Sequence, residues 1–230
     1  MGGKGCRGHT RCGESSLTDA PALLPSGLVT DDDDVKSDGD SSRLPDWVFP
    51  PPEGFIAADL DRIPDAPTHT ELIDGSLVFR SPQTCIHMRT VSLLTEGLHR
   101  QIPRDLRVRR DMSVILGLRQ RPEPDVSVIR AQAERGPDQT SYEAEDVLLV
   151  VEVVSPDSEE RDRKRKPQLY AEADIPNFWR VENNSGRPTV YVYELDPATK
   201  AYALTGIHHD RLKLSLPFKI DIDLTEIDAL

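Results

Sequence analysis

Two acidic side chains stand in the most apolar parts of the sequence. Glu152 lies within residues 146–154, which are almost entirely β-branched or aliphatic, and Asp125 begins the apolar run 125–129. A buried carboxylate is costly unless a cation, a metal ion or a proton compensates its charge. If the two runs are neighbouring strands, the carboxylates could converge on one divalent ion, and hard oxygen ligands suit Mg²⁺ or Mn²⁺. Taken singly, Glu152 could equally form a structural salt bridge, and Asp125 could be an ordinary turn carboxylate.

Lys166 could supply a cation to the same centre. It follows Glu152 in a strand–loop–helix segment, and the helix would direct its long side chain back toward the strand ends. Lys166 also ends a basic run over 161–166, and such charge runs are usually solvated faces. Pro167 comes next, and proline is tolerated in the first turn of a helix but not in its interior. The segment therefore predicts either a helix that begins near 164–166 or a displaced Lys166.

The elements that must position these residues alternate between strand and helix patterns. Residues 71–79 indicate a β-hairpin around Asp74-Gly75, and apolar residues at helical spacing from His87 to Leu98 indicate one helix. Residues 146–154 are typical of a strand covered on both faces, and a helix follows to about residue 173. Further strands are expected over 106–116, 124–129, 178–181, 189–195 and 202–205. We predict an α/β (α+β) domain with a central mixed β-sheet flanked by helices.

Length and composition bound the organisation of the chain. Its 230 residues suit one domain of ordinary size plus a tail. Residues 1–43 are rich in Gly, Ser and Asp and carry few large apolar groups, so we predict a disordered acidic tail there and a folded domain over 44–230. No apolar run approaches the roughly 20 residues of a membrane helix, so no membrane partner is expected.

Cysteine content and charge bear on compartment and partners. The three cysteines give an odd count that favours a reducing, cytoplasmic location, and Cys6, His9 and Cys12 lack the further ligands of a zinc site. The net charge of −12 argues against a nucleic-acid partner. Basic residues are nevertheless clustered, over 107–110 and over 161–166. The distribution of charge therefore leaves nucleic acid open as a partner.

An ordered set of short motifs runs through residues 54–225. In chain order they are Glu71-Leu-Ile-Asp-Gly75, Ser81-Pro82 with His87, Pro124-Asp125-Val126, Val151-Glu-Val-Val-Ser-Pro156, Asp162 with Lys166 and Tyr170, and Ile175-Pro176 with Phe178-Trp179. Each motif is weak alone, but the ordered set resembles the Uma-two family of the PD-(D/E)XK nuclease superfamily. The resemblance implies the restriction-endonuclease-like fold.

The resemblance also implies roles for individual residues. Asp125 matches the family's metal-binding aspartate and Glu152 its second acidic ligand, so both are expected to bind Mg²⁺ or Mn²⁺. Lys166 matches the family's lysine on the following helix, whereas the position that often carries lysine in the superfamily is Val154 here. Glu71 matches a further acidic position that could reach the same centre.

Together these roles imply a Mg²⁺-dependent endonuclease that hydrolyses phosphodiester bonds in nucleic acid, with DNA favoured. Arg161, Arg163, Lys164 and Arg165 would hold backbone phosphates. His87 matches a family histidine, although its place on the apolar stripe suits a core-edge histidine somewhat better. The alternative function is a non-catalytic interaction or assembly module on a nuclease fold, because fold does not fix function. A homodimer is compatible with either function, but no residue indicates one.

Overall fold

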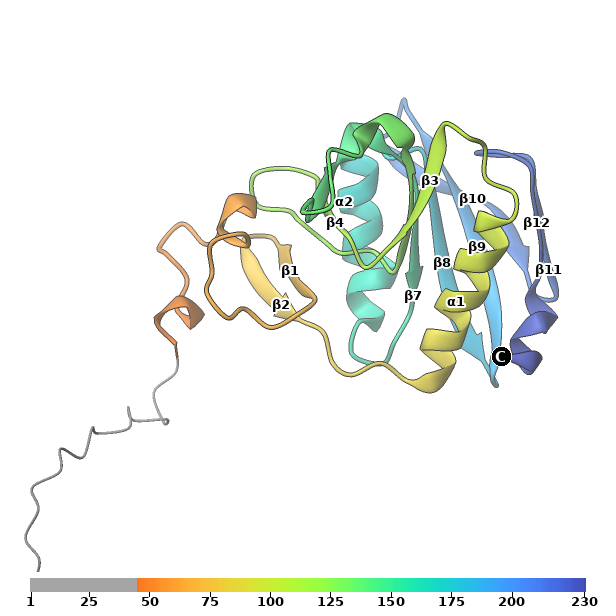
Figure 1. Cartoon of the computed structure of the whole chain (residues 1–230), viewed down its shortest axis with the longest axis horizontal. Helices are drawn as coiled ribbons and strands as arrows, with labels where there is room; N and C mark the ends of the chain where they lie inside the picture. The colour runs from red at the N-terminus through yellow and green to blue at the C-terminus, as the bar shows by residue number, and fades with distance from the viewer. Residues whose placement is uncertain (1–44) are drawn as a thin grey trace, which may run out of the picture. The chain divides into compact units, whose positions relative to one another are not determined.

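The most apolar run of the sequence forms β7 (Val147–Val153), an inner strand of a six-stranded sheet in the computed structural model (Figure 1). The strand order is β10-β9-β8-β7-β5-β3. Only β7 and β8 run parallel, and the other neighbours are antiparallel. The remaining strands of the sheet are β3 (Leu106–Arg110), β5 (Val126–Arg130), β8 (Asn177–Asn184), β9 (Arg187–Asp196) and β10 (Ala201–His208). The predicted central mixed sheet is confirmed.

One α-helix packs on each face of this sheet. The helix α1 (Cys85–His99) begins at Thr84, whose side chain accepts a hydrogen bond from the His87 backbone N–H, as an N-cap residue does. Its apolar stripe shares one core with alternate residues of β7, including Val151. The helix α2 (Lys166–Glu172) joins a second core on the other face, which includes Val150. Because successive strand residues point to opposite faces, Glu152 points toward α2.

Smaller strand pairs and short helices complete the fold. The predicted hairpin is confirmed as β1 (Thr70–Ile73) and β2 (Ser76–Phe79), joined by Asp74 and Gly75 with φ of 54° and 76°, as a tight hairpin turn requires. The other pairs are β4 (Ser113–Ile115) with β6 (Ser141–Glu143), and β11 (Arg211–Leu214) with β12 (Ile220–Asp223). The 3-10 helices are Asp46–Val48, Ala57–Asp59, Ala131–Ala133, Ala144–Asp146 and Leu224–Ala229.

The predicted strand over 106–116 is wrong in one respect, because the chain turns within it. β3 ends at Arg110, and Asp111 adopts a left-handed conformation with φ of 49°. This conformation breaks the extended backbone. β4 therefore starts afresh at Ser113 and pairs with β6 instead of continuing along the central sheet.

The structure describes residues 45–230, which form one unit, Pro45–Leu230. The predicted disordered tail over 1–43 lies outside the described residues. Within the described part, no helix has both the length and the apolar character needed to cross a membrane.

The central position of β7 predicts that a Leu→Ala substitution destabilises the protein more in β7 than in the edge strand β10. Leu149→Ala should lower the free energy of unfolding by about 2–5 kcal/mol, because it empties part of the core around a fully buried side chain. Leu204→Ala on the edge strand β10 removes the same atoms from a side chain that is 49% exposed, and should cost less than about 1 kcal/mol. Urea denaturation measures both values. Equal losses would contradict the placement of β7 at the centre of the core.

Candidate functional site

The two acids singled out in the sequence face each other across neighbouring strands. Val126 of β5 is the partner of Val151 in β7, so Asp125 and Glu152 are the next opposing pair. Both side chains are 2% exposed. They line one cavity of about 10 Å³, which is room for about one water molecule or ion. Strand register therefore brings the two carboxylates to one place.

A lysine lies at the centre of three of the carboxylates. Lys166 Nζ lies 2.8 Å from Glu71 Oε1, 3.2 Å from Glu152 Oε1 and 3.4 Å from Asp162 Oδ1. The Tyr170 hydroxyl donates a further hydrogen bond to Glu152 Oε1 at 2.5 Å. The structure thus places Glu71, Glu152 and Lys166 together, as expected, and the ammonium compensates the buried negative charge.

Helix geometry explains how Lys166 reaches the site despite Pro167. Residues Arg161–Arg165 form a π-helix, and the Lys166 backbone N–H donates to the Arg161 carbonyl five residues earlier. α2 begins at Lys166, so Pro167 stands in its first turn, where no N–H donor is needed. The i,i+4 spacing of Asp162, Lys166 and Tyr170 directs all three side chains inward. Lys166 is therefore not displaced by the proline.

Asp125 has a different set of partners. Arg80 donates a hydrogen bond to Asp125 Oδ1, the Val153 backbone N–H donates to Oδ2 at 2.7 Å, and His87 Nε2 lies 3.3 Å from Oδ2. Burial opposes ionisation, but the close contact with His87 and the charge of Arg80 outweigh it and lower the pKa of Asp125. Asp125 is therefore an anion that two basic side chains hold.

Glu152 shows the opposite behaviour. Burial raises the pKa of this carboxyl well above its usual value, and the negative charges of Asp162, Asp125 and Glu71 raise it further against the opposing effect of Lys166. The environment therefore pushes the pKa of Glu152 up and the pKa of Asp125 down. Two carboxyls whose pKa values are pushed apart in this way are characteristic of functional sites.

Comparison with known sequences identifies the family. Residues 57–225 match the sequence model of the Uma2 family, whose description is "Putative restriction endonuclease". The chain belongs to the Uma2 family. This match confirms the family that the ordered motifs resemble. No curated protein matches the chain.

A solved structure supports the fold of this Uma2 protein. It is the crystal structure of "a putative nuclease belonging to DUF820 from Anabaena variabilis ATCC 29413". The two chains share 14% sequence identity with a TM-score of 0.59, over 75% of this chain and 96% of the other. At this identity the likeness shows a common fold, and the expected nuclease fold is thereby confirmed.

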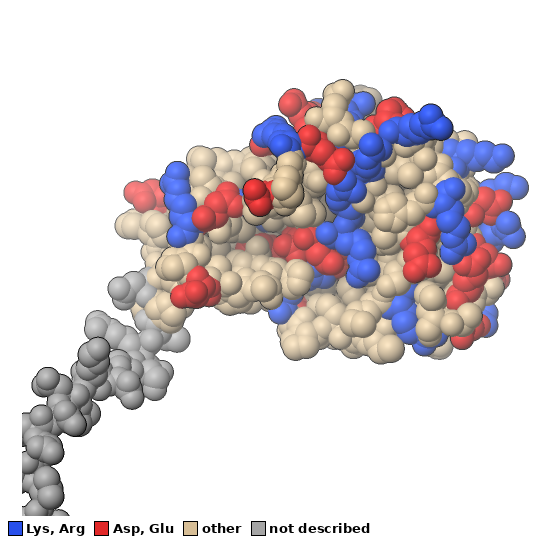
Figure 2. Space-filling model, viewed as in Figure 1, with Lys and Arg blue, Asp and Glu red and all other residues tan. Residues whose placement is uncertain are grey.

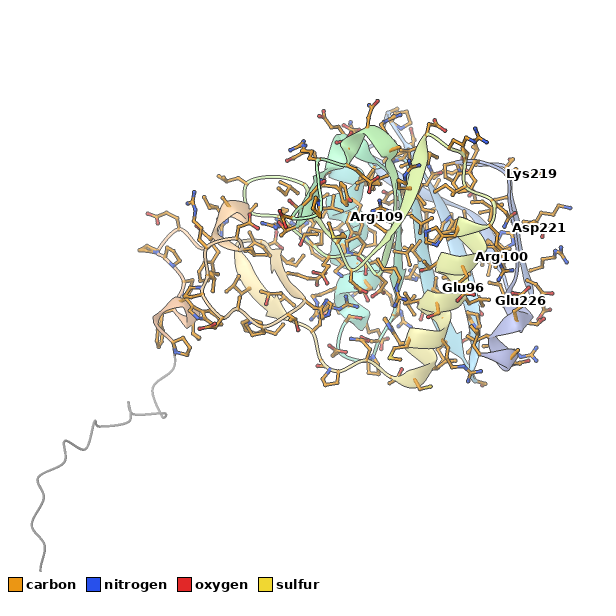
Figure 3. All side chains as sticks on the ribbon, viewed as in Figure 1. Glu96, Arg100, Arg109, Lys219, Asp221 and Glu226 are labelled. Carbon is orange, nitrogen blue, oxygen red and sulfur yellow. The ribbon has the colours of Figure 1, made fainter. Side chains whose placement is uncertain are left out.

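The basic residues expected to hold phosphates lie close to carboxylates in this Uma2 protein. Arg161 lines the cavity itself. The next three each form an ion pair: Arg163 with Glu159 and Glu182, Lys164 with Glu160 and Arg165 with Asp74. The face in Figure 2 likewise intersperses Lys and Arg with Asp and Glu. Arg109, labelled in Figure 3, also pairs with Glu134.

Arg80 is the site residue that the sequence did not indicate. It follows β2 directly and reaches Asp125, 45 positions away in the chain. The attraction of Asp125 and Glu152 outweighs its burial and raises the pKa of its guanidinium. The Ser81-Pro82 motif beside it was the only local signal. His87, by contrast, was placed at the core edge, and it is buried there while also contacting Asp125.

Removal of the central ammonium should destabilise the protein in a pH-dependent way. In Lys166→Met, Glu152 loses the charge that holds its pKa down, so its folded-state pKa rises further above the unfolded value. A raised carboxyl pKa costs stability as pH increases, because the folded state must release a proton that it binds more tightly than the unfolded state. We expect a loss of about 3–5 kcal/mol at pH 8 and a smaller loss at pH 5.

Urea denaturation at the two pH values measures this difference. Lys164→Met is the matched control, because it makes the same change in an exposed ion pair with Glu160 and should cost less than about 1 kcal/mol. A loss for Lys166→Met that stays constant between pH 5 and pH 8 would contradict the buried ion-pair network.

Proposed function

We propose that this protein is a metal-dependent endonuclease that hydrolyses phosphodiester bonds in nucleic acid, with DNA favoured. The observation that carries the proposal is that Asp125, just before β5, Glu152 of β7 and Lys166 of α2 converge on one cavity. Membership of the Uma2 family supports the same function.

The donor atoms of the cavity suit a hard divalent cation. Asp125 and Glu152 offer carboxylate oxygens, the ligands that Mg²⁺ and Mn²⁺ prefer, and Glu71 adds a third carboxylate. Arg80 and Lys166 now provide positive charge at these oxygens. The negative charge that these two side chains compensate supports the binding of a cation in their place. Asp125 and Glu152 would hold the ion, which when bound polarises the phosphate and lowers the pKa of the attacking water.

The remaining residues of the site would position the attacking water and balance the charge of the phosphate. Lys166 would orient the attacking water through the N–H donors that now contact Glu71 and Glu152, and its charge would offset the negative charge that develops on the phosphate. Glu71 is itself fixed by a hydrogen bond from the Glu123 backbone N–H at 2.9 Å. Arg80, released from Asp125, would be free to pair with a substrate phosphate.

Substrate would bind through the basic residues beside the cavity. Arg161 is placed best, because it lines the cavity, and Arg163, Lys164 and Arg165 follow it in the π-helix. To contact phosphates, the last three would have to exchange their carboxylate partners. With a net charge of −12, we expect weak and strongly salt-dependent binding.

A second candidate function, a non-catalytic interaction or assembly module, is favoured by one observation. The buried acids are already paired, Asp125 with Arg80 and Glu152 with Lys166, so the network is complete without a metal ion. Such a network can stabilise a scaffold alone. Metal binding and cleavage distinguish the two functions.

Substitution of either acid should abolish cleavage. The wild-type protein should nick or linearise supercoiled plasmid DNA with Mg²⁺ or Mn²⁺. Asp125→Asn and Glu152→Gln should each lower the rate more than about 100-fold, because each removes a metal ligand. Glu226→Gln and Asp228→Asn are matched controls on the C-terminal 3-10 helix, outside the cavity lining, and should cleave like the wild type.

Two results would contradict this function. The first is cleavage at the wild-type rate by Asp125→Asn or Glu152→Gln. The second is failure of every form to cleave DNA or RNA with either metal ion. The second result, together with no measurable binding of Mg²⁺ or Mn²⁺ by calorimetry, would favour the non-catalytic module.

Arg161 provides a separate test of substrate binding. In the inactive Glu152→Gln background, Arg161→Gln should weaken DNA binding and reduce the slope of log K against log salt concentration by about 1, as expected for one lost phosphate contact. Fluorescence anisotropy over a range of salt concentrations measures the slope. The control is Arg187→Gln, an exposed arginine paired with Asp228. An unchanged slope for Arg161→Gln would exclude Arg161 from the interface.

A further inference from the structure

Three residues from separate segments bring metal-binding atoms together beside the candidate active site. His69 precedes β1, Asp111 follows β3, and Glu123 precedes β5. One ring nitrogen and one oxygen from each carboxylate all lie within 4.8 Å of one another. None of the three residues is assigned a role above.

The carboxylates in this cluster retain free coordination capacity. Glu123 is 8% exposed, yet its Oε2 accepts no hydrogen bond from any described residue. Its Oε1 contacts only His69 Nδ1 at hydrogen-bond distance, 2.5 Å away. No side chain among residues 45–230 donates a hydrogen bond to the Asp111 carboxylate. A cation bound at these oxygens would use lone pairs that no described donor occupies.

This cluster is distinct from the Asp125–Glu152 centre, because Arg80 lies between them. One guanidinium nitrogen donates to Asp125, while the other lies 3.6 Å from Asp111 Oδ1 and 3.8 Å from Glu123 Oε1, too far for a good hydrogen bond. Arg80 therefore occupies no lone pair of these two oxygens, and only Glu123 Oε1 has another partner, His69 Nδ1.

An open cavity gives access to the cluster. The cavity has a volume of about 370 Å³, and its lining includes His69, Asp111 and Arg80. A hydrated ion could enter there and keep water on its remaining coordination positions. Ligands fixed on three different segments would hold these segments together.

We propose that His69, Asp111 and Glu123 form a second metal site, for a divalent transition-metal ion such as Mn²⁺, Co²⁺ or Zn²⁺. One imidazole nitrogen with two carboxylate oxygens is a mixed donor set that suits these ions better than Mg²⁺ or Ca²⁺. The site does not depend on the proposed nuclease activity, and its test does not use cleavage.

Co²⁺ is the probe, because it reports a histidine ligand directly. The full chain should carry Cys6→Ser, Cys12→Ser and Cys85→Ser, which removes the competing thiolates. In this background, Asp125→Asn/Glu152→Gln should still bind one Co²⁺ by calorimetry and show a paramagnetically shifted histidine N–H signal by NMR. A protein without Co²⁺ binding in this form would overturn the proposal, whatever the outcome of the cleavage assay.

Substitution of the ligands completes the test. Adding His69→Gln should abolish the shifted signal and weaken Co²⁺ binding at least tenfold, and Asp111→Asn should weaken it similarly. His99→Gln, at the end of α1, is the matched control and should bind Co²⁺ unchanged. Both ligand side chains are partly exposed, so neither change should unfold the domain. Wild-type Co²⁺ affinity in His69→Gln would overturn the proposal.

Discussion

The Lys166 ammonium, buried among Glu71, Glu152 and Asp162, is the interaction on which the arrangement of the site depends. Its partners come from the β1–β2 hairpin, the central sheet and the π-helix, so one charge connects three parts of the domain. A buried ion pair need not add stability over apolar packing, but removing one partner is costly because the others remain buried. The network therefore fixes the relative positions of the hairpin, the central sheet and the π-helix more than it adds to the stability of the fold.

Around this charge the protein separates two carboxyls that face each other. Asp125 is held as an anion by Arg80, His87 and a backbone N–H, whereas burial and the neighbouring acids raise the pKa of Glu152. A cation that bound both would have to displace the Arg80 guanidinium from Asp125 and the Lys166 ammonium from Glu152. Metal affinity and proton release are linked in any site of this kind.

Much of this could be predicted from the sequence. The apolar run around Glu152 predicted a covered strand, and an acid inside it predicted a paired or functional carboxylate. The hairpin followed from Asp74-Gly75 because that turn is encoded locally. The prediction that Asp125 and Glu152 lie close together required only that their two apolar runs form neighbouring strands.

What escaped prediction depends on contacts between distant segments. The π-helix that accommodates Pro167 has no local signature, and neither does the turn at Asp111 that divides the strand expected over 106–116. Arg80 and Glu123 have no distinguishing local pattern, and their roles emerge only from the contact between the hairpin and the segment that precedes β5. The short pair β11–β12 was absent from the predicted elements, although Arg211-Leu-Lys-Leu214 and Ile220-Asp-Ile-Asp223 alternate charged and apolar residues as strands do.

The π-helix Arg161–Arg165 makes the geometry of the site depend on the number of residues in this segment. Each residue of an α-helix rotates the chain by about 100°, so deleting one residue from this turn would restore regular helix upstream and swing either Asp162 or Lys166 out of the interior. The side chains that face solvent along this turn are under no such constraint. Within the family, we therefore expect this stretch to keep its length.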